Sequence, residues 1–89
     1  MSKWQIRFSD EAFKALKKLD NSIVRLIDSW ISKHLENCED PRLYGKPLVA
    51  NLKGKWRYRI GDYRMLCEIE DNILLVLVIK IGHRRDIYK

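Results

Sequence analysis

A chain of 89 residues has room for one domain with a modest core and excludes a two-domain arrangement. With 46% hydrophobic and 34% charged residues, the composition is typical of a folded soluble protein and excludes a disordered tail. No apolar run reaches the roughly 18 residues that a membrane span needs, and the first residues lack a signal-peptide core. We therefore expect one cytoplasmic domain over residues 1–89, with no membrane partner.

The first half of the chain predicts a strand followed by a helix hairpin. Trp4, Ile6 and Phe8 alternate with polar residues, which is the pattern of a half-buried strand. Ser9 is a suitable N-cap for a helix that we expect to end near Leu19. After the polar residues 20–22, a second helix is predicted by an apolar stripe that comprises Ile23, Leu26, Ile27, Trp30, Ile31 and His34.

The second half predicts three strands after an irregular connection. Residues 39–53 contain two prolines and a glycine and show no sustained period. Period-two patterns predict strands over 55–60 and 63–69, joined by a tight turn at Gly61-Asp62. Residues 73–79 are apolar throughout, so this strand should lie inside the sheet and be covered on both faces.

The predicted fold is an α+β domain of the order β-α-α-β-β-β. Because the strand over 73–79 needs two neighbours, the four-stranded sheet should have the order second, third, fourth, first. The N-terminal helix hairpin should pack on one face of this sheet.

The net charge of +6 lies entirely in the second half of the chain. Residues 1–41 contain seven basic and seven acidic residues, whereas residues 42–89 contain eleven basic and five acidic residues. An asymmetry of this kind is typical of a nucleic-acid-binding face.

Basic and aromatic residues of the second half form a candidate RNA site. Strand alternation places Arg57, Arg59 and Arg64 on one face of two neighbouring strands, where they could bind phosphate. His83 and Tyr88 follow the last strand and could stack on a base or transfer a proton. The alternative is a merely solvated, charged sheet face. Arg84 should act with these three arginines in stabilising phosphate charge. Further RNA contacts are expected from Lys53, Lys55, Lys80 and Arg85.

Metal and thiol chemistry have little support in the sequence. The acidic residues of the second half form no cluster suited to magnesium, and His34 and Cys38 could supply only two ligands. Cys67 belongs to the core-facing set of its strand, which makes a nucleophilic pair with His83 a weak hypothesis. We expect no metal, no cofactor and reduced cysteines.

Three segments of the chain resemble the RelE branch of the RelE/ParE toxins. They are residues 41–48 (PRLYGKPL), 52–64 (LKGKWRYRIGDYR) and 81–88 (IGHRRDIY), and the predicted order of elements agrees with that family over nearly the whole chain. The resemblance implies the toxin of a type II toxin-antitoxin pair, an mRNA interferase that cleaves mRNA in the ribosomal A site without a metal. It also implies a RelB-like antitoxin as the inhibiting partner.

The resemblance also implies roles for individual residues. The family's two basic positions on the first hairpin strand fall on Arg57 and Arg59, and its arginine on the next strand falls on Arg64. Its arginine after the last strand falls on Arg84 and its C-terminal tyrosine on Tyr88, although the spacing between them is shorter than in the best-known member.

One departure from the family pattern changes the expected chemistry. The best-known members have lysines where this chain has Arg57 and Arg59. An arginine side chain stays charged at physiological pH, so it can stabilise phosphate charge but cannot act as a base. Since histidine typically titrates near neutrality, His83 is the expected proton-transfer group.

The sequence thus predicts an endoribonuclease that aligns the ribose 2′-OH for attack on the adjacent phosphate. Two alternatives remain open. The ParE branch poisons DNA gyrase without enzymatic activity, and its members generally lack the clustered arginines and the terminal tyrosine. A module that binds RNA or the ribosome without cutting is the other alternative.

Overall fold

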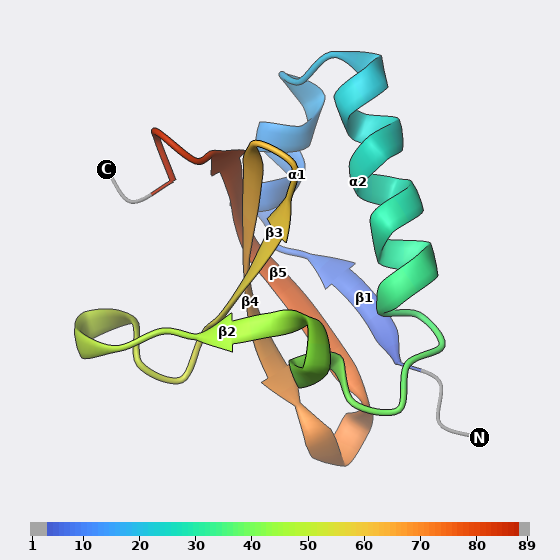
Figure 1. The fold of residues 1–89 in the computed structure, drawn as a ribbon, viewed down its shortest axis with the longest axis vertical. Coiled ribbons are helices and arrows are strands. Elements are labelled where there is room, and N and C mark those ends of the chain that lie inside the picture. Colours follow the sequence, from blue (N-terminus) through green and yellow to red (C-terminus); the bar gives the residue numbers. More distant parts are fainter. Residues whose placement is uncertain (1–3, 88–89) are drawn as a thin grey trace.

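Two helices pack against a twisted sheet of five strands (Figure 1), and the computed structural model describes residues 4–87. No helix in this range is long and apolar enough to cross a membrane. The two helices are α1 (Asp10–Lys17) and α2 (Asn21–His34). The other elements are β1 (Gln5–Phe8), β2 (Gly45–Pro47), β3 (Trp56–Ile60), β4 (Tyr63–Glu70) and β5 (Leu75–His83), with short 3-10 turns η1 (Pro41–Tyr44), η2 (Ala50–Leu52) and η3 (Asp71–Ile73).

Local signals place both helices where the sequence predicts them. The Ser9 hydroxyl accepts a hydrogen bond from the Ala12 N–H at 3.1 Å and so caps the start of α1. Acidic residues in its first turn and lysines in its last turn complement the helix dipole. On α2, Ile27 and Ile31 are buried and form the centre of the apolar stripe. The helix hairpin is confirmed, with α1 ending at Lys17 rather than near Leu19.

The strand order is β1-β5-β4-β3-β2. The four predicted strands are neighbours in the predicted order, and β1 runs parallel to β5. The four-stranded prediction was nevertheless incomplete, because β2 pairs with β3 as a fifth strand at the edge. β2 has three residues and ends at Pro47, so it is too short to show an alternation of polar and apolar side chains. For this reason the sequence pattern placed it in the irregular connection.

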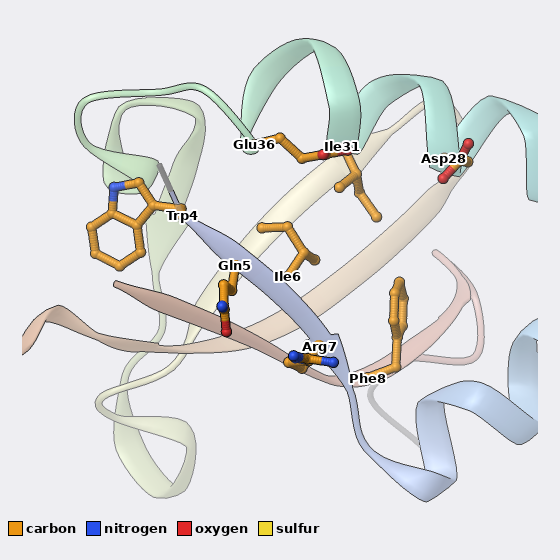
Figure 2. A pocket seen from close by; sticks show the side chains of 8 residues that line it. All are labelled: Trp4, Gln5, Ile6, Arg7, Phe8, Asp28, Ile31 and Glu36. Carbon is orange, nitrogen blue, oxygen red and sulfur yellow. The ribbon is translucent and has the colours of Figure 1, made fainter. Parts of the chain in front are cut away.

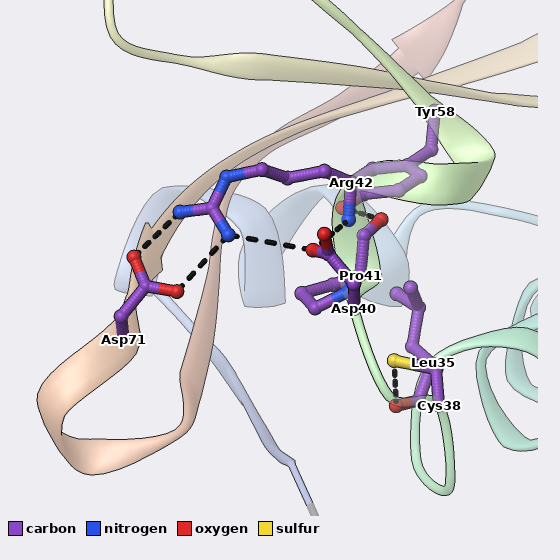
Figure 3. Close-up of polar contacts among 7 residues, drawn as sticks. All are labelled: Leu35, Cys38, Asp40, Pro41, Arg42, Tyr58 and Asp71. Atoms are coloured by element: carbon purple, nitrogen blue, oxygen red, sulfur yellow. Dashed lines mark hydrogen bonds and ion pairs between the residues drawn. The ribbon is translucent and has the colours of Figure 1, made fainter.

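A clasp of polar contacts holds the segment before β2 against the sheet (Figure 3). The buried Tyr58 hydroxyl donates to the Pro41 carbonyl at 2.8 Å. The Arg42 guanidinium binds both carboxylate oxygens of Asp71 at 3.0 and 2.6 Å, and this contact lowers the pKa of the Asp71 carboxyl. A Cβ atom at Gly45 would lie 2.9 Å from the Tyr58 ring, so glycine permits the close approach of β2.

A β-bulge in β5 changes which face of the sheet its residues occupy. Cys67 pairs with Val78 and Leu66 pairs with Lys80, which leaves Ile79 as an extra residue. Val76 and Val78 are therefore buried before the bulge, and odd-numbered residues take the buried positions after it. The strand continues to His83 instead of ending at residue 79.

The strand is interior but is not covered on both faces as expected. Val76 and Val78, on the face that α2 covers, are fully buried, whereas Leu75 and Leu77 on the opposite face are only half-buried. We call the side of the sheet away from α2 the open face. It is the face on which polar side chains can meet a ligand.

We predict that Tyr58→Phe lowers the free energy of unfolding by about 1–2 kcal/mol, because the Pro41 carbonyl loses its hydrogen-bond donor in a buried setting. Urea unfolding should show a lower midpoint with an unchanged slope. Tyr44→Phe is the matched control, since the Tyr44 hydroxyl makes no hydrogen bond within residues 4–87. Equal stability of the two variants would contradict the role of the clasp.

Candidate nucleic-acid interface

Basic side chains on the open face lie in two adjacent cross-strand rows. In the first row Arg59 of β3 pairs with Arg64 of β4, and Arg64 pairs with Gly82 of β5. The second row runs over four strands and comprises Lys46, Arg57, Leu66 and Lys80. The structure thus brings together three of the predicted arginines and one predicted lysine.

The charge in these rows is not neutralised by neighbouring acids. Within residues 4–87, Arg57, Arg59 and Lys80 make no ion pair. Lys55 differs, because its ammonium lies 3.3 Å from the Glu68 carboxylate. Like charges directly opposite each other destabilise a sheet, so the Arg59–Arg64 pair is a cost that an anionic ligand would relieve.

The turn between β3 and β4 fixes Arg64 and one further arginine, Arg84, at one end of the sheet. The Arg64 guanidinium donates to the carbonyls of Gly61 and Tyr63, both at 2.9 Å. The Arg84 backbone N–H donates to the Asp62 carbonyl at 2.8 Å, and its side chain lies 3.8 Å from the Asp62 carboxylate. This exposed ion pair is weak. The turn therefore holds Arg84 beside Arg64 and leaves its guanidinium accessible.

His83 was expected beside the arginines, but the register places it on the other face. It pairs with Tyr63, and the two rings meet edge to face at 5.5 Å between centroids. The bulge at Ile79 is the physical reason, because it reverses the direction of every later side chain in β5. The Nδ1 atom of His83 accepts the Arg85 backbone N–H at 3.2 Å, so the ring supports the turn that carries Arg84.

The remaining predicted residues lie around the two rows. Lys53 is exposed in the loop after η2, and Arg85 is exposed in the turn after β5. Tyr88 lies outside the described residues, so its role stays a prediction. In Figure 1 the η2 loop and the turn after β5 lie on the opposite side of the sheet from α2.

A hollow in the open face was missed by the sequence reasoning. It has a volume of about 260 Å³, and its lining comprises Glu11, Asn51, Leu52, Lys55, Leu66, Ile79, Lys80 and Ile87. Ile87 reaches it because the chain turns back after β5, where the Asp86 N–H donates to the His83 carbonyl at 2.8 Å. The sequence contained one signal for this hollow. Arg64, Leu66 and Glu68 were predicted to lie on the same face of their strand, and Leu66 is the apolar residue among them.

The cysteines and His34 have structural contacts. The His34 ring stacks on Trp30, with its Nδ1 atom 3.0 Å from the Trp30 carbonyl oxygen, and the Cys38 thiol donates to the Leu35 carbonyl at 3.0 Å. Cys67 is fully buried, and burial raises the pKa of its thiol. Its interpretation as a packing residue is confirmed. Within residues 4–87, no three His, Cys, Asp or Glu side chains gather as metal ligands.

A second surface lies at the outer edge of β1, away from the basic rows. Figure 2 shows Ile6 and Phe8 pointing from β1 toward α2, whereas Gln5 and Arg7 point away from it. A groove of about 580 Å³ follows this edge. A more apolar groove beside it includes Leu16, Val24 and Ile27 and shares Phe8, Asp28 and Ile31 with the first.

Comparison with known proteins supports the family suggested by these features. A family model described as the ParE toxin of type II toxin-antitoxin system, parDE, matches residues 6–88. Toxin RelG of Mycobacterium tuberculosis is 33% identical over 97% of this chain and 97% of its own length. The chain belongs to the RelE/ParE toxin superfamily.

Solved structures of the superfamily have the same fold. A chain of the toxin-antitoxin complex RelBE2 from Mycobacterium tuberculosis is 30% identical, with a TM-score of 0.84, and the match covers 93% of this chain and 100% of that chain. A chain of the archaeal RelE-RelB complex from Pyrococcus horikoshii is 20% identical, with a TM-score of 0.72, and the match covers 96% and 99% of the two chains. The latter likeness concerns the fold alone.

We predict that Arg57→Gln and Arg59→Gln weaken binding of an uncleavable 2′-O-methyl RNA oligomer in a salt-dependent way. Each substitution should reduce the slope of log affinity against log salt concentration by about 0.7, because one fewer phosphate is neutralised. Arg25→Gln on α2 removes the same charge away from the open face and should leave the slope unchanged. Equal slopes for all three variants, measured by fluorescence anisotropy, would place the RNA elsewhere.

Proposed function

We propose that this RelE/ParE-superfamily toxin is a metal-independent endoribonuclease that cleaves mRNA in the cytoplasm, with the ribosomal A site as its place of action. The observation that carries the proposal is the pair of basic rows on the open face. Arg59 and Arg64 lie directly opposite each other, and Arg57 lies in the next row without an acidic partner in residues 4–87. Such a surface suits a phosphodiester whose negative charge increases in the transition state.

The chemistry available to these residues is electrostatic. Arginine side chains can hold the phosphate and stabilise the developing charge, but they cannot remove the proton of the nucleophile. In the proposed reaction the ribose 2′-hydroxyl loses its proton as its oxygen forms a bond to the adjacent phosphorus. The bond to the 5′-oxygen breaks, and that oxygen takes up a proton. The products are a 2′,3′-cyclic phosphate and a 5′-hydroxyl end, and no water or metal is consumed in this step.

The proton-transfer roles of His83 and Tyr88 stay predictions. The position of the His83 ring behind the arginine rows, against Tyr63, favours a supporting role for the turn after β5. Arg84 is held at the same end of the sheet as Arg64 and is proposed to contact the same phosphate or its neighbour.

A second function deserves a direct test because the matching family model is described as a ParE toxin. A gyrase poison of this fold would act by binding, and its arginines would need no phosphate. The two functions differ in their products, since only the endoribonuclease creates new RNA ends.

We predict that controlled expression in a bacterium creates mRNA fragments with 5′-hydroxyl ends inside translated codons. Sequencing that separates 5′-hydroxyl from 5′-phosphate ends measures this outcome. Arg64→Ala should lower the cleavage rate about a hundredfold, since one positioned charge contributes roughly 3 kcal/mol. Arg25→Ala is the matched control. DNA-damage signalling without new RNA ends would favour the gyrase poison, and 5′-phosphate ends would mean that water is the nucleophile.

A small RelB-like antitoxin is the proposed protein partner. The matched structures from Mycobacterium tuberculosis and Pyrococcus horikoshii are the toxin-antitoxin complex RelBE2 and a RelE-RelB complex. On this chain, the apolar groove that includes Leu16, Val24 and Ile27 could bind the apolar face of an amphipathic helix. Asp28 and Arg25 at the same groove would contact its polar side.

We predict that Val24→Glu weakens antitoxin binding at least tenfold, because a charge replaces an apolar contact in the groove. Titration calorimetry with the product of the neighbouring gene measures the effect. Ser29→Glu adds the same charge at an exposed position of α2 outside both grooves and should bind normally. Toxicity of the free protein should persist in both variants; undiminished binding by Val24→Glu would move the antitoxin to another surface.

A further inference from the structure

We propose that the hollow on the open face is a nucleobase site that prefers guanine. The inference deepens the proposed function and rests on it, because the base would belong to the RNA whose phosphates lie on the basic rows. The link is direct, since Leu66 and Lys80 belong both to the second row and to the lining of the hollow.

The shape and lining of the hollow suit a single planar base. Its volume of about 260 Å³ lies below the range of roughly 300–1,000 Å³ that drug-sized ligands occupy. Leu66 and Ile87 are almost fully buried, although they belong to a face that is otherwise basic. Ile79 is directed there by the bulge, and Leu52 adds a further apolar contact. Apolar side chains of this kind offer contact to the faces of a base but none to phosphate.

The fold adds three separate segments to the strands that line the hollow. The first turn of α1 contributes Glu11, the η2 loop contributes Asn51, and the turn after β5 contributes Ile87. Gly82 makes room for the last of these, since a Cβ atom there would lie 3.4 Å from the Ile87 Cδ1 atom. The hollow therefore exists only when the turn after β5, the η2 loop and the first turn of α1 are all in place.

The polar lining discriminates between bases. Glu11 is a carboxylate on a face that is otherwise positive, and it makes no ion pair within residues 4–87. A carboxylate repels phosphate, but it can accept two parallel hydrogen bonds from the N1–H and the amino group of guanine. The Asn51 amide can donate to the guanine O6 atom. Lys55 and Lys80 lie beside the base, where the flanking phosphates would pass.

The test compares the trinucleotides UGU, UIU, UAU and UCU, each with 2′-deoxyribose at the first and central positions so that neither phosphodiester can be cut. Affinities and methyl chemical shifts are measured by NMR titration of the full chain. We expect UGU to bind about tenfold more tightly than UIU, because inosine lacks the amino group that a charged acceptor would bind. The methyl signals of Leu52, Leu66, Ile79 and Ile87 should shift with UGU.

Glu11→Gln should remove the preference for UGU over UIU while leaving the weak binding of UIU nearly unchanged. Asp10→Asn is the matched control, because it removes a carboxylate from the same helix turn without touching the hollow. A wild type without base preference would overturn the proposal, as would an unchanged preference in Glu11→Gln or an equal loss in Asp10→Asn. Base preference without RNA cleavage would instead keep the base site and refute the endoribonuclease.

Discussion

The extra residue Ile79 in β5 is the constraint on which both faces of the sheet depend. With a regular strand, the alternation set by Val76 and Val78 would direct Lys80 into the core, where an unpaired ammonium costs several kcal/mol. The bulge directs Lys80 to the open face and buries Ile81 instead. The Ser9 hydroxyl donates to the Ile79 carbonyl at 3.0 Å, so the cap of α1 also secures the bulge. One backbone irregularity thereby separates the core from the candidate site.

This separation allows the open face to carry unfavourable charge without loss of the fold. An opposed pair such as Arg59 and Arg64 costs up to about 1 kcal/mol, whereas burying one large apolar side chain contributes roughly 1.5–3 kcal/mol. The core under α2 contains a dozen buried side chains and depends on no residue of the basic rows. The contacts of Arg42 with Asp71 and of Tyr58 with Pro41 hold the segment between α2 and β2 against the sheet. Stability and ligand binding can therefore be altered independently by substitution.

The parts of the molecule that depend on local patterns could be predicted from the sequence. Alternation in residues 55–60 and 63–69 was enough to pair the strands and to place Arg57, Arg59 and Arg64 together. The bulge could not be predicted, because residues 73–79 are all apolar. Without an alternation of polar and apolar side chains, the sequence gives no sign that an extra residue reverses the two faces of the strand. His83 was misplaced for that reason. The hollow was missed because Glu11, Asn51 and Ile87 meet only through tertiary structure.

Arginine in place of lysine also limits how the site can respond to pH. Because guanidinium groups stay charged throughout the physiological range, the charge that Arg57, Arg59 and Arg64 present to phosphate is constant. Any titration of the proposed cleavage near neutrality must then come from a different group. Tyr58 and Cys67, in the core behind the open face, do not supply it, since burial raises the pKa values of both side chains away from neutrality. The described part of the site thus supplies position and charge, and the substrate supplies the nucleophile.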